Sequence, residues 1–368
     1  MELASDPHAV EPDAKYPIAG VYGFGRGMIQ RAAVTGREIA ASQLFRIRAG
    51  QLIYSRLKSF EGAYAIVSDE VDGYFVSNEF PTFDLHTERL EPSFLRWYLK
   101  QERIWRQLAS DGKGIGARRE RLHPKRFLEH EIALPPLPEQ QRVAGSLDNI
   151  AARIAWRRSK AGVAEIELSA ALRAAFDKIV IGAPRRRLGD VAPIVRRPVE
   201  IEANGIYSEL GVRSFGRGLF KKPDLRGVEL TWQKLFQIRH GDLVFSNIKA
   251  WEGAFAVAGP DDDGKVGSHR YLTCVVDNMI ASPIFLCYFL QSPSGLSQVQ
   301  AASPGSADRN RTLSQKKLAA IDVPVPSIED QSWFDDLLRR VEVARAKLSD
   351  VGAELDHLIP SLMHQAFD

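Results

Sequence analysis

The chain has 368 residues, with 49 basic against 46 acidic residues and 45% hydrophobic content, which is long enough for two or three domains with cores of their own. A charged fraction of 26% with 9% aromatic residues excludes a chain that is disordered throughout, and two cysteines exclude a disulfide scaffold or a four-cysteine zinc site. No apolar run has the length of a membrane span and the N-terminus lacks the pattern of a secretory signal, so we expect a cytoplasmic protein with no membrane partner.

One offset of 191 residues relates the first half of the chain to the second. Residues 44–63 (LFRIRAGQLIYSRLKSFEGA) align with residues 235–254 (LFQIRHGDLVFSNIKAWEGA), and eleven of these twenty positions are identical. Phe-Gly-Arg-Gly recurs in the same register, at 24–27 and at 215–218. Because the register continues to Ala-Phe-Asp at the end of each copy without an insertion, we interpret the chain as a tandem duplication of one large unit rather than a solenoid.

The first part of each copy has the pattern of a small mixed domain. Alternating, β-branched and aromatic runs at 51–55, 63–67 and 74–76 predict strands, and the run at 242–246 repeats the first of them. Residues 92–99 begin with proline and have the composition of a short helix. Each copy is therefore predicted to begin with a compact α+β domain.

A proline-rich segment closes each of these domains, and a long segment with helical periodicity follows it. Residues 139–180 and 330–368 carry apolar side chains three and four positions apart, so we expect two long helices, the first about 60 Å in length. The first segment has seven basic and five acidic residues, whereas the second has four basic and eight acidic residues. This charge difference favours an antiparallel coiled coil over the alternative that each helix packs only on its own domain.

The patterns of catalytic and nucleotide-binding sites are missing from both copies. The glycine-rich run at 112–116 lacks the Lys-Ser/Thr ending of a phosphate-binding loop, and residues 23–27 lack the dinucleotide-binding spacing. The eight histidines do not have the spacing of metal ligands. We therefore predict a protein with no catalytic residue, no metal and no cofactor, in which two similar domains each recognise a ligand.

Basic residues among glycines are the feature that the two domains share. Arg26 and Arg217 occupy the Phe-Gly-Arg-Gly loops, where glycine allows the backbone to approach a ligand and an arginine can bind guanine or phosphate. The alternative is a tight turn with a solvent-facing arginine. For the shared Lys58 and Lys249, a local ion pair with the glutamate three residues later explains the pattern better than a ligand contact does. The aromatic residues that follow, Phe60 and Trp251, are expected in the core rather than as stacking platforms.

Several polar positions differ between the copies, such as Arg56, which becomes Asn247. Shared basic residues with variable polar neighbours are expected of two domains that hold phosphates in the same way and read different bases. The predicted DNA-binding residues are Arg26, Arg31, Arg56, Lys58, Asn78, Arg118, Arg119, Arg213, Arg217, Lys221, Lys222, Asn247, Lys249, His269, Arg270, Arg309, Asn310 and Arg311.

Together these features resemble the specificity (S) subunits of Type I restriction–modification systems. The resemblance rests on the two tandem domains, on Leu-Pro-Pro-Leu-Pro-Glu-Gln-Gln and Pro-Ser-Ile-Glu-Asp-Gln before the long helices, and on the closing Ala-Phe-Asp. Phe-Gly-Arg-Gly followed by Ser-x-x-Lys-x-Phe/Trp-Glu-Gly-Ala is similar to one class of target-recognition domain in that family. The resemblance covers essentially the whole chain.

The resemblance implies an α+β fold of two homologous α/β target-recognition domains, at 1–138 and 182–329, with spacer helices at 139–181 and 330–368 that pair as an antiparallel coiled coil. Each domain would read one half of a bipartite, asymmetric site in double-stranded DNA. The helices would set the spacing and dock two modification (methyltransferase) subunits, which in the family use S-adenosylmethionine, and restriction (motor-nuclease) subunits would complete the complex.

One run of residues departs from a simple duplication. Residues 187–191 (Arg-Leu-Gly-Asp-Val) open the second copy like the usual start of a recognition domain, whereas Met1 aligns with Ala192. We expect either a gene start upstream of this methionine or a first domain that another segment completes. Two rival functions also stay open: a specificity subunit of a Type IIB- or IIG-like restriction–methyltransferase, and a coiled-coil scaffold whose domains bind proteins.

Overall fold

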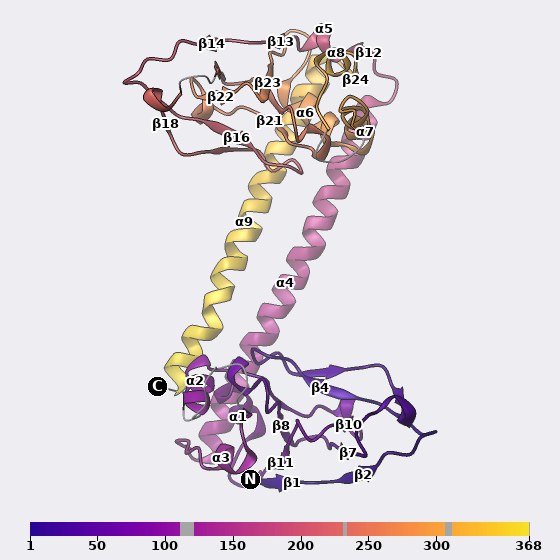
Figure 1. Cartoon of the computed structure of the whole chain (residues 1–368), viewed down its shortest axis with the longest axis vertical. Helices are drawn as coiled ribbons and strands as arrows, with labels where there is room; N and C mark the ends of the chain where they lie inside the picture. The colour runs from indigo at the N-terminus through magenta and orange to yellow at the C-terminus, as the bar shows by residue number, and fades with distance from the viewer. Residues whose placement is uncertain (111–120, 231–233, 306–310, 368) are drawn as a thin grey trace. The chain divides into compact units, whose positions relative to one another are not determined.

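The computed structural model describes residues 1–110, 121–230, 234–305 and 311–367, and it divides into two compact units. Unit 1 comprises Met1–Ala161 and Ser349–Asp368, and unit 2 comprises Gly162–Leu348. Helices α4 (Leu137–Val180) and α9 (Ile328–Phe367) each contribute residues to both units (Figure 1).

Unit 1 contains short strands followed by three short helices. Its largest sheet has the order β1-β11-β8-β9, a second has the order β10-β7-β2, and β3-β6 and β4-β5 form two hairpin-like pairs. The elements are β1 (Glu2–Ala4), β2 (Pro7–Ala9), β3 (Lys15–Tyr16), β4 (Ala19–Val21), β5 (Met28–Gln30), β6 (Val34–Thr35), η1 (Gly36–Glu38), β7 (Gln43–Arg46), β8 (Leu52–Tyr54), η2 (Ser59–Glu61), β9 (Tyr64–Ile66), η3 (Asp69–Val71), β10 (Phe75–Val76), β11 (Thr82–Asp84), α1 (Pro92–Tyr98), α2 (Glu102–Ser110) and α3 (Pro124–Leu128).

Unit 2 repeats this arrangement, with sheets of order β13-β23-β20-β21 and β14-β19-β22 and the pairs β15-β18, β16-β17 and β12-β24. Its elements are β12 (Arg185–Arg187), α5 (Leu188–Val191), β13 (Ile194–Val195), β14 (Pro198–Val199), β15 (Ile206–Tyr207), β16 (Leu210–Val212), β17 (Leu219–Lys221), β18 (Leu225–Arg226), η4 (Gly227–Glu229), β19 (Leu235–Gln237), β20 (Leu243–Ser246), η5 (Ala250–Glu252), β21 (Phe255–Val257), η6 (Pro260–Asp262), β22 (Val266–Ser268), β23 (Tyr271–Cys274), α6 (Pro283–Gln291), α7 (Pro293–Ala301), α8 (Gln315–Ala319) and β24 (Asp322–Pro324).

The central strand of each large sheet is buried on both faces. Leu52 and Tyr54 of β8 pack against α1, whereas Ile53, which points to the other face because strand side chains alternate, belongs to a second cluster. In β20, Phe245 and Val244 divide between two clusters in the same way. Burial on both faces explains why the sequence of this strand is a continuous apolar run. The strand packs between two hydrophobic clusters.

The units differ at β12 and α5, which come from the join between the copies. In unit 2, β12 pairs with β24, and the side chains of Leu188 and Val191 in α5 are completely buried. Among the described residues of unit 1, no strand pairs with residues 131–133, the segment equivalent to β24. As a result Leu134 is 41% exposed, whereas its equivalent Val325 is 8% exposed.

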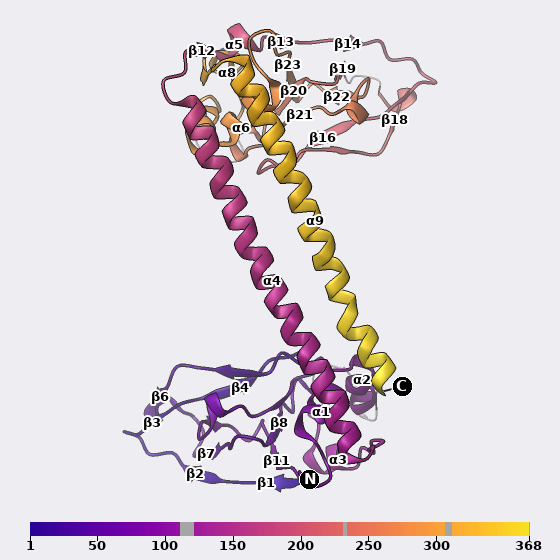
Figure 2. The ribbon, with the colours of Figure 1, turned by 180° about the vertical axis from the view of Figure 1, so that it is seen from behind.

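The long helices pack together within each unit. In unit 2, the Nε atom of Arg345 on α9 lies 2.9 Å from Oε1 of Glu165 on α4, and the rings of Phe176 and Phe334 lie 5.3 Å apart, so the two segments run antiparallel. Figure 2 shows the ribbons of α4 and α9 from behind. Helix α4 follows the first domain in sequence, but its C-terminal end belongs to the core of unit 2. The alternative that this helix packs only on its own domain is therefore wrong.

The end of α9 takes the equivalent place in unit 1. The ring of Phe367 lies 5.1 Å from Phe94 of α1, and the corresponding distance from Phe176 to Phe285 of α6 is 5.2 Å. Phe176 and Phe367 are therefore structurally equivalent, each beside the short helix of the other copy. The predicted α+β fold of two domains joined by long helices is confirmed. In the described residues, no helix is both long and apolar enough to span a membrane.

An aspartate on each long helix binds the neighbouring short helix. Asp148 of α4 accepts hydrogen bonds from Ser93 at 2.6 Å and from Trp97 Nε1 at 2.9 Å, and it pairs with Arg96. Burial raises the pKa of Asp148, but these hydrogen bonds outweigh burial and hold the pKa below its ordinary value. The charged form of Asp148 therefore stabilises unit 1, and this stabilisation decreases as the pH falls towards the pKa.

The pKa of Asp335 on α9 is shifted in the opposite direction, upward. Its Oδ2 atom accepts a hydrogen bond from Ser282, and burial raises its pKa. Because the folded-state pKa lies above the unfolded value, the carboxylate destabilises the fold at higher pH, and that cost disappears as the pH falls through the folded pKa. We expect Asp335→Asn to be more stable than the parent protein at neutral pH in urea unfolding, with a difference that shrinks in acid. Asp148→Asn is the control and should be less stable at neutral pH; destabilisation by both changes would contradict the prediction.

Candidate nucleic-acid interface

The Phe-Gly-Arg-Gly loops form the tips of two equivalent β-hairpins. In unit 1, β4 pairs with β5 in the antiparallel sense and residues 22–27 connect them. In unit 2, β16 pairs with β17 and residues 213–218 form the connection. Each hairpin is a two-stranded sheet of its own.

The hairpin tips expose their arginines. Arg26 donates from Nε to the Gly23 carbonyl oxygen at 3.1 Å, and its guanidinium carbon lies 5.1 Å from the ring centre of Tyr22. Arg217 is likewise exposed. Neither arginine forms an ion pair within the described part of the chain. The loop is thus a tight turn with a solvent-facing arginine, as in the alternative given by the sequence, and its positive charge is exposed.

The phenylalanine that opens each Phe-Gly-Arg-Gly loop has a strained backbone. Phe24 has a φ of 61° and Phe215 a φ of 62°, and they are the only non-glycine residues with positive φ in the described ranges. A left-handed conformation costs a residue with a Cβ atom about 1–2 kcal/mol. Their side chains are 63% and 72% exposed, so burial of the rings does not compensate for this cost. The sequence did not predict the left-handed conformation of these two phenylalanines, although the repeated Phe-Gly-Arg-Gly marks their positions.

Two backbone hydrogen bonds attach each hairpin tip to a 3-10 turn. In unit 1, the amides of Phe24 and Gly25 donate to the carbonyl oxygens of Glu61 and Gly62 at 2.6 and 2.9 Å. In unit 2, Phe215 and Gly216 make the same contacts with residues 252–253 at 2.8 and 3.0 Å. The hairpin tip and the turn after the central strand therefore form one surface in each unit.

The shared lysines of these turns form the local ion pairs expected from the sequence. Lys58 Nζ lies 3.9 Å from Glu61 Oε2, and Lys249 Nζ lies 2.7 Å from Glu252 Oε1. The hydrogen bond from Lys249 lowers the pKa of Glu252. Phe60 and Trp251 on the same turns are half-buried rather than core residues, so the prediction for them was wrong; each sits at the edge of its domain because the turn follows the buried strand.

Arg56 and Asn247, which differ between the copies, lie at the end of the central strand. The Arg56 amide donates to the Glu79 carbonyl oxygen and its own carbonyl oxygen accepts from the Leu122 amide, at 2.9 and 3.0 Å. Asn247 makes the equivalent bonds with residues 270 and 313 at 2.7 and 2.8 Å. Three segments far apart in sequence thus meet at this position in each unit.

The side chain at this position keeps an unpaired polar atom in both units. Arg56 Nε and Asn247 Oδ1 are buried without a hydrogen-bond partner in the part of the chain that the structure describes. A buried polar atom without a partner is unfavourable and rare in native proteins. The same feature recurs at equivalent positions, so both strand ends hold a polar atom that no described protein group satisfies.

The remaining predicted residues divide by their ionic contacts. Lys221 pairs with Asp224 at 3.2 Å and Lys222 with Glu209 at 2.9 Å, while Arg311 lies 4.9 Å from the ring centre of Trp251. Asn78 and His269 are exposed. Arg118, Arg119, Arg309 and Asn310 lie outside the described residues. The predicted arginines that form no ion pair with described residues are Arg26, Arg31, Arg56, Arg213, Arg217 and Arg270.

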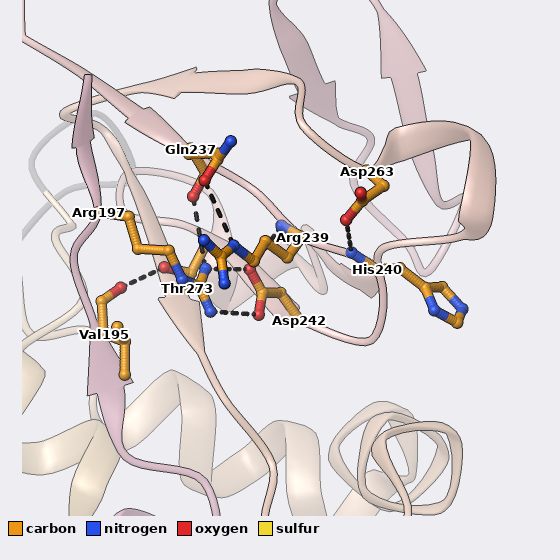
Figure 3. A network of polar contacts seen from close by, with 8 residues as sticks. All are labelled: Val195, Arg197, Gln237, Arg239, His240, Asp242, Asp263 and Thr273. Atoms are coloured by element: carbon orange, nitrogen blue, oxygen red, sulfur yellow. Dashed lines mark hydrogen bonds and ion pairs between the residues drawn. The ribbon is translucent and has the colours of Figure 1, made fainter. Parts of the chain in front are cut away.

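A buried ion pair anchors the start of the central strand in unit 2 (Figure 3). Both oxygens of Asp242 accept from the guanidinium group of Arg197, at 2.6 and 3.1 Å, and Asp242 also accepts from the Arg239 amide at 2.9 Å. Asp242 is only 2% exposed. Such a paired and fully hydrogen-bonded carboxylate fixes the chain where β20 begins, and β20 leads directly to Asn247.

The described residues show no group of three or more histidine, cysteine, aspartate or glutamate side chains placed to hold a metal ion. Cys274 and Cys287 are both buried, and burial raises the pKa of each thiol to about 12. They are therefore core residues in the protonated form. The two surfaces offer cationic, aromatic and amide groups, which are the groups that bind phosphates and bases.

Comparisons with known proteins agree on the fold. No protein-family model and no curated protein matches the chain. The crystal structure of the HsdS subunit from Thermoanaerobacter tengcongensis is similar at a TM-score of 0.62 and 19% identity, covering 100% of this chain and 94% of that one. A chain from a structure concerned with complex assembly and conformational transition of the type I R-M system has a TM-score of 0.63 at 19% identity, covering 100% and 99%. The resemblance seen in the sequence is thus confirmed for the fold, over the whole chain.

Proposed function

We propose that this chain is the DNA-specificity subunit of a Type I restriction–modification complex. The observation that carries the proposal is the agreement in fold with an HsdS subunit over 100% of the chain. The presence of one exposed arginine hairpin in each unit supports it, because a bipartite site requires two similar surfaces.

In this proposal each unit reads one half of an asymmetric site in double-stranded DNA. The target-recognition domains are residues 1–138 and 182–329, and the spacer helices at 139–181 and 330–368 pair as a coiled coil and set the distance between half-sites. The same helices dock two modification (methyltransferase) subunits, and restriction subunits join that complex. The chain itself is a cytoplasmic, non-catalytic subunit without a cofactor.

The ionic contacts suggest how the predicted residues divide their roles. The lysines at 58, 221, 222 and 249 already have acidic partners, so a phosphate must compete with a carboxylate for each of them. The arginines without an ion pair are available for phosphates and bases at no such cost. Arg56 and Asn247 favour different bases, because arginine pairs best with guanine and asparagine with adenine.

Selection from random duplexes tests the proposal. The chain is assembled with its methyltransferase subunits, bound duplexes are sequenced over several rounds, and the salt dependence of binding is measured for the winning sequence. We expect two short motifs at one fixed spacing, with an affinity that falls steeply as salt increases. Enrichment of no sequence would exclude a specificity subunit and favour the protein-binding scaffold.

The identity of the enzyme that co-purifies with the chain distinguishes a Type I complex from the remaining alternative, a Type IIB- or IIG-like restriction–methyltransferase. Separate modification and restriction chains are expected for a Type I complex. A single polypeptide with both activities would indicate a Type IIB- or IIG-like restriction–methyltransferase instead.

A further inference from the structure

Phe24 and Phe215 combine two features that are unfavourable in a folded protein. Each has a left-handed backbone that residues with a Cβ atom rarely adopt, and each exposes most of a large apolar ring. Glycine would relieve the backbone strain and a polar residue would relieve the exposure. The two copies nevertheless share phenylalanine here, while the preceding residue differs, Gly23 in one copy and Ser214 in the other.

The surroundings hold this conformation in place. The amides of Phe24 and Phe215 are each fixed by a hydrogen bond to the neighbouring 3-10 turn. The next residue is glycine in both copies; a Cβ atom on Gly25 would lie 2.7 Å from Lys100 Cγ, and one on Gly216 would lie 3.0 Å from the Gln291 amide. The chain therefore passes close to the C-terminal end of the short helix. Most of the preceding ring stays exposed in both copies, although the Phe24 ring also lies 6.2 Å from the ring of Trp105.

An arginine accompanies each ring at the same distance. The guanidinium carbon of Arg26 lies 5.8 Å from the ring centre of Phe24, and that of Arg217 lies 5.8 Å from the ring centre of Phe215. An exposed ring beside a cation, at the tip of a hairpin, matches the requirements of a nucleic acid, which presents apolar base faces next to phosphates. A protein partner would be expected to bury such a ring in a larger apolar surface.

We propose that Phe24 and Phe215 insert between neighbouring base pairs of duplex DNA, one in each half-site, while Arg26 and Arg217 bind beside them. This inference rests on the proposed function and adds to it a deformation of the DNA at two points. An inserted ring unstacks one base step, so a half-site with an easily unstacked step binds better even where no base edge is contacted.

Substitution by glycine separates this role from folding. Glycine adopts the left-handed conformation without strain, so Phe24→Gly and Phe215→Gly should unfold at the same or a higher denaturant concentration than the parent chain. We expect each variant complex to bind the selected duplex at least about tenfold more weakly. The slope of affinity against salt should stay unchanged, because no phosphate contact is removed.

A fluorescent base locates the insertion. 2-Aminopurine replaces each adenine of the selected duplex in turn, opposite thymine, and its fluorescence should rise on binding beside the unstacked step of each half-site. Because a methyltransferase also extrudes its target base, the rise that reports insertion is the one that the glycine variants remove. Phe24→Gly should abolish the rise in the first half-site only and Phe215→Gly in the second only, so each variant is the matched control for the other.

The possible failures are distinguishable. If the parent complex selects no sequence, the proposed function itself fails. If the parent complex binds its duplex but the glycine variants bind equally well, or no step becomes fluorescent, the insertion is wrong. Loss of co-purification with the methyltransferase subunits in Phe24→Gly would show that the ring contacts protein, which also overturns the inference.

Discussion

Replacing Gln331 with leucine should lower the free energy of unfolding by about 2–4 kcal/mol, because three polar groups lose their partner at once. Gln331 is completely buried at the start of α9. Its Oε1 atom accepts from the Ser282 amide at 2.8 Å, and Nε2 donates to the carbonyl oxygens of Ile280 and Pro326 at 3.1 and 2.9 Å. It thus joins the proline segment, the loop before α6 and the long helix.

Gln140 makes the same three contacts in unit 1. Its side chain accepts from the Glu91 amide at 2.9 Å and donates to Arg89 and Pro135 at 2.9 and 2.7 Å. Gln140→Leu should therefore cost a similar amount. The repeated Pro-x-x-x-x-Gln pattern at the start of both long helices, Pro135 to Gln140 and Pro326 to Gln331, is explained by this contact, which attaches the helix to its domain.

Gln141→Leu is the matched control, since Gln141 is the next residue and is exposed. Urea unfolding gives the size of each effect, and hydrogen exchange followed by mass spectrometry gives its location. We expect faster exchange near residues 89–91 for Gln140→Leu and near residues 280–282 for Gln331→Leu. Equal, small effects for Gln140→Leu and Gln141→Leu would show that the buried contacts do not stabilise the junction.

The sequence predicted the elements well where hydrophobic burial determines them. The run at 51–55 became β8 and the run at 242–246 became β20, because a strand between two cores needs apolar residues on both faces. The long segments became α4 and α9, with α4 beginning at Leu137, two residues earlier than expected, because Pro138 fits the first turn of a helix.

Long-range packing and backbone strain were harder to predict. The matching Ala-Phe-Asp ends revealed the duplication, but periodicity alone does not tell which domain a helix end packs against, and Phe176 and Phe367 each pack beside the other copy's short helix. The left-handed phenylalanines were missed because local sequence rules assign that conformation to glycine. Contacts with the rest of the fold impose it here.

In the candidate interface, too, the sequence predicted what residue type determines and missed what the fold imposes. Sequence comparison of the copies found Arg26, Arg217 and the variable pair Arg56 and Asn247, because residue type alone marks them as candidates. It also anticipated the pairs that the shared lysines form with nearby glutamates. It did not reveal that a polar atom without a protein partner lies at the end of the central strand, because that feature depends on side-chain geometry.

The double variant Arg26→Ala/Arg217→Ala should reduce discrimination between the selected duplex and a random one by about 2–6 kcal/mol, if each arginine reads a guanine for about 1–3 kcal/mol. The two residues belong to different compact units, so we expect their effects to add. Each single variant should relax only its own half-site in binding measurements with one half-site scrambled at a time.

Arg37→Ala is the control for Arg26→Ala and Arg226→Ala is the control for Arg217→Ala. Each control removes an exposed arginine that belongs to the same unit as its test residue but lies outside the hairpin tip. They should leave discrimination unchanged. A uniform loss of affinity for all duplexes, with a shallower salt dependence, would show that Arg26 and Arg217 bind phosphates, and base reading would then pass to the strand-end pair Arg56 and Asn247. A loss restricted to one half-site in each single variant is the result expected if Arg26 and Arg217 read bases, because each belongs to a different unit. The differing pair Arg56 and Asn247 would then account for the difference between the two half-sites.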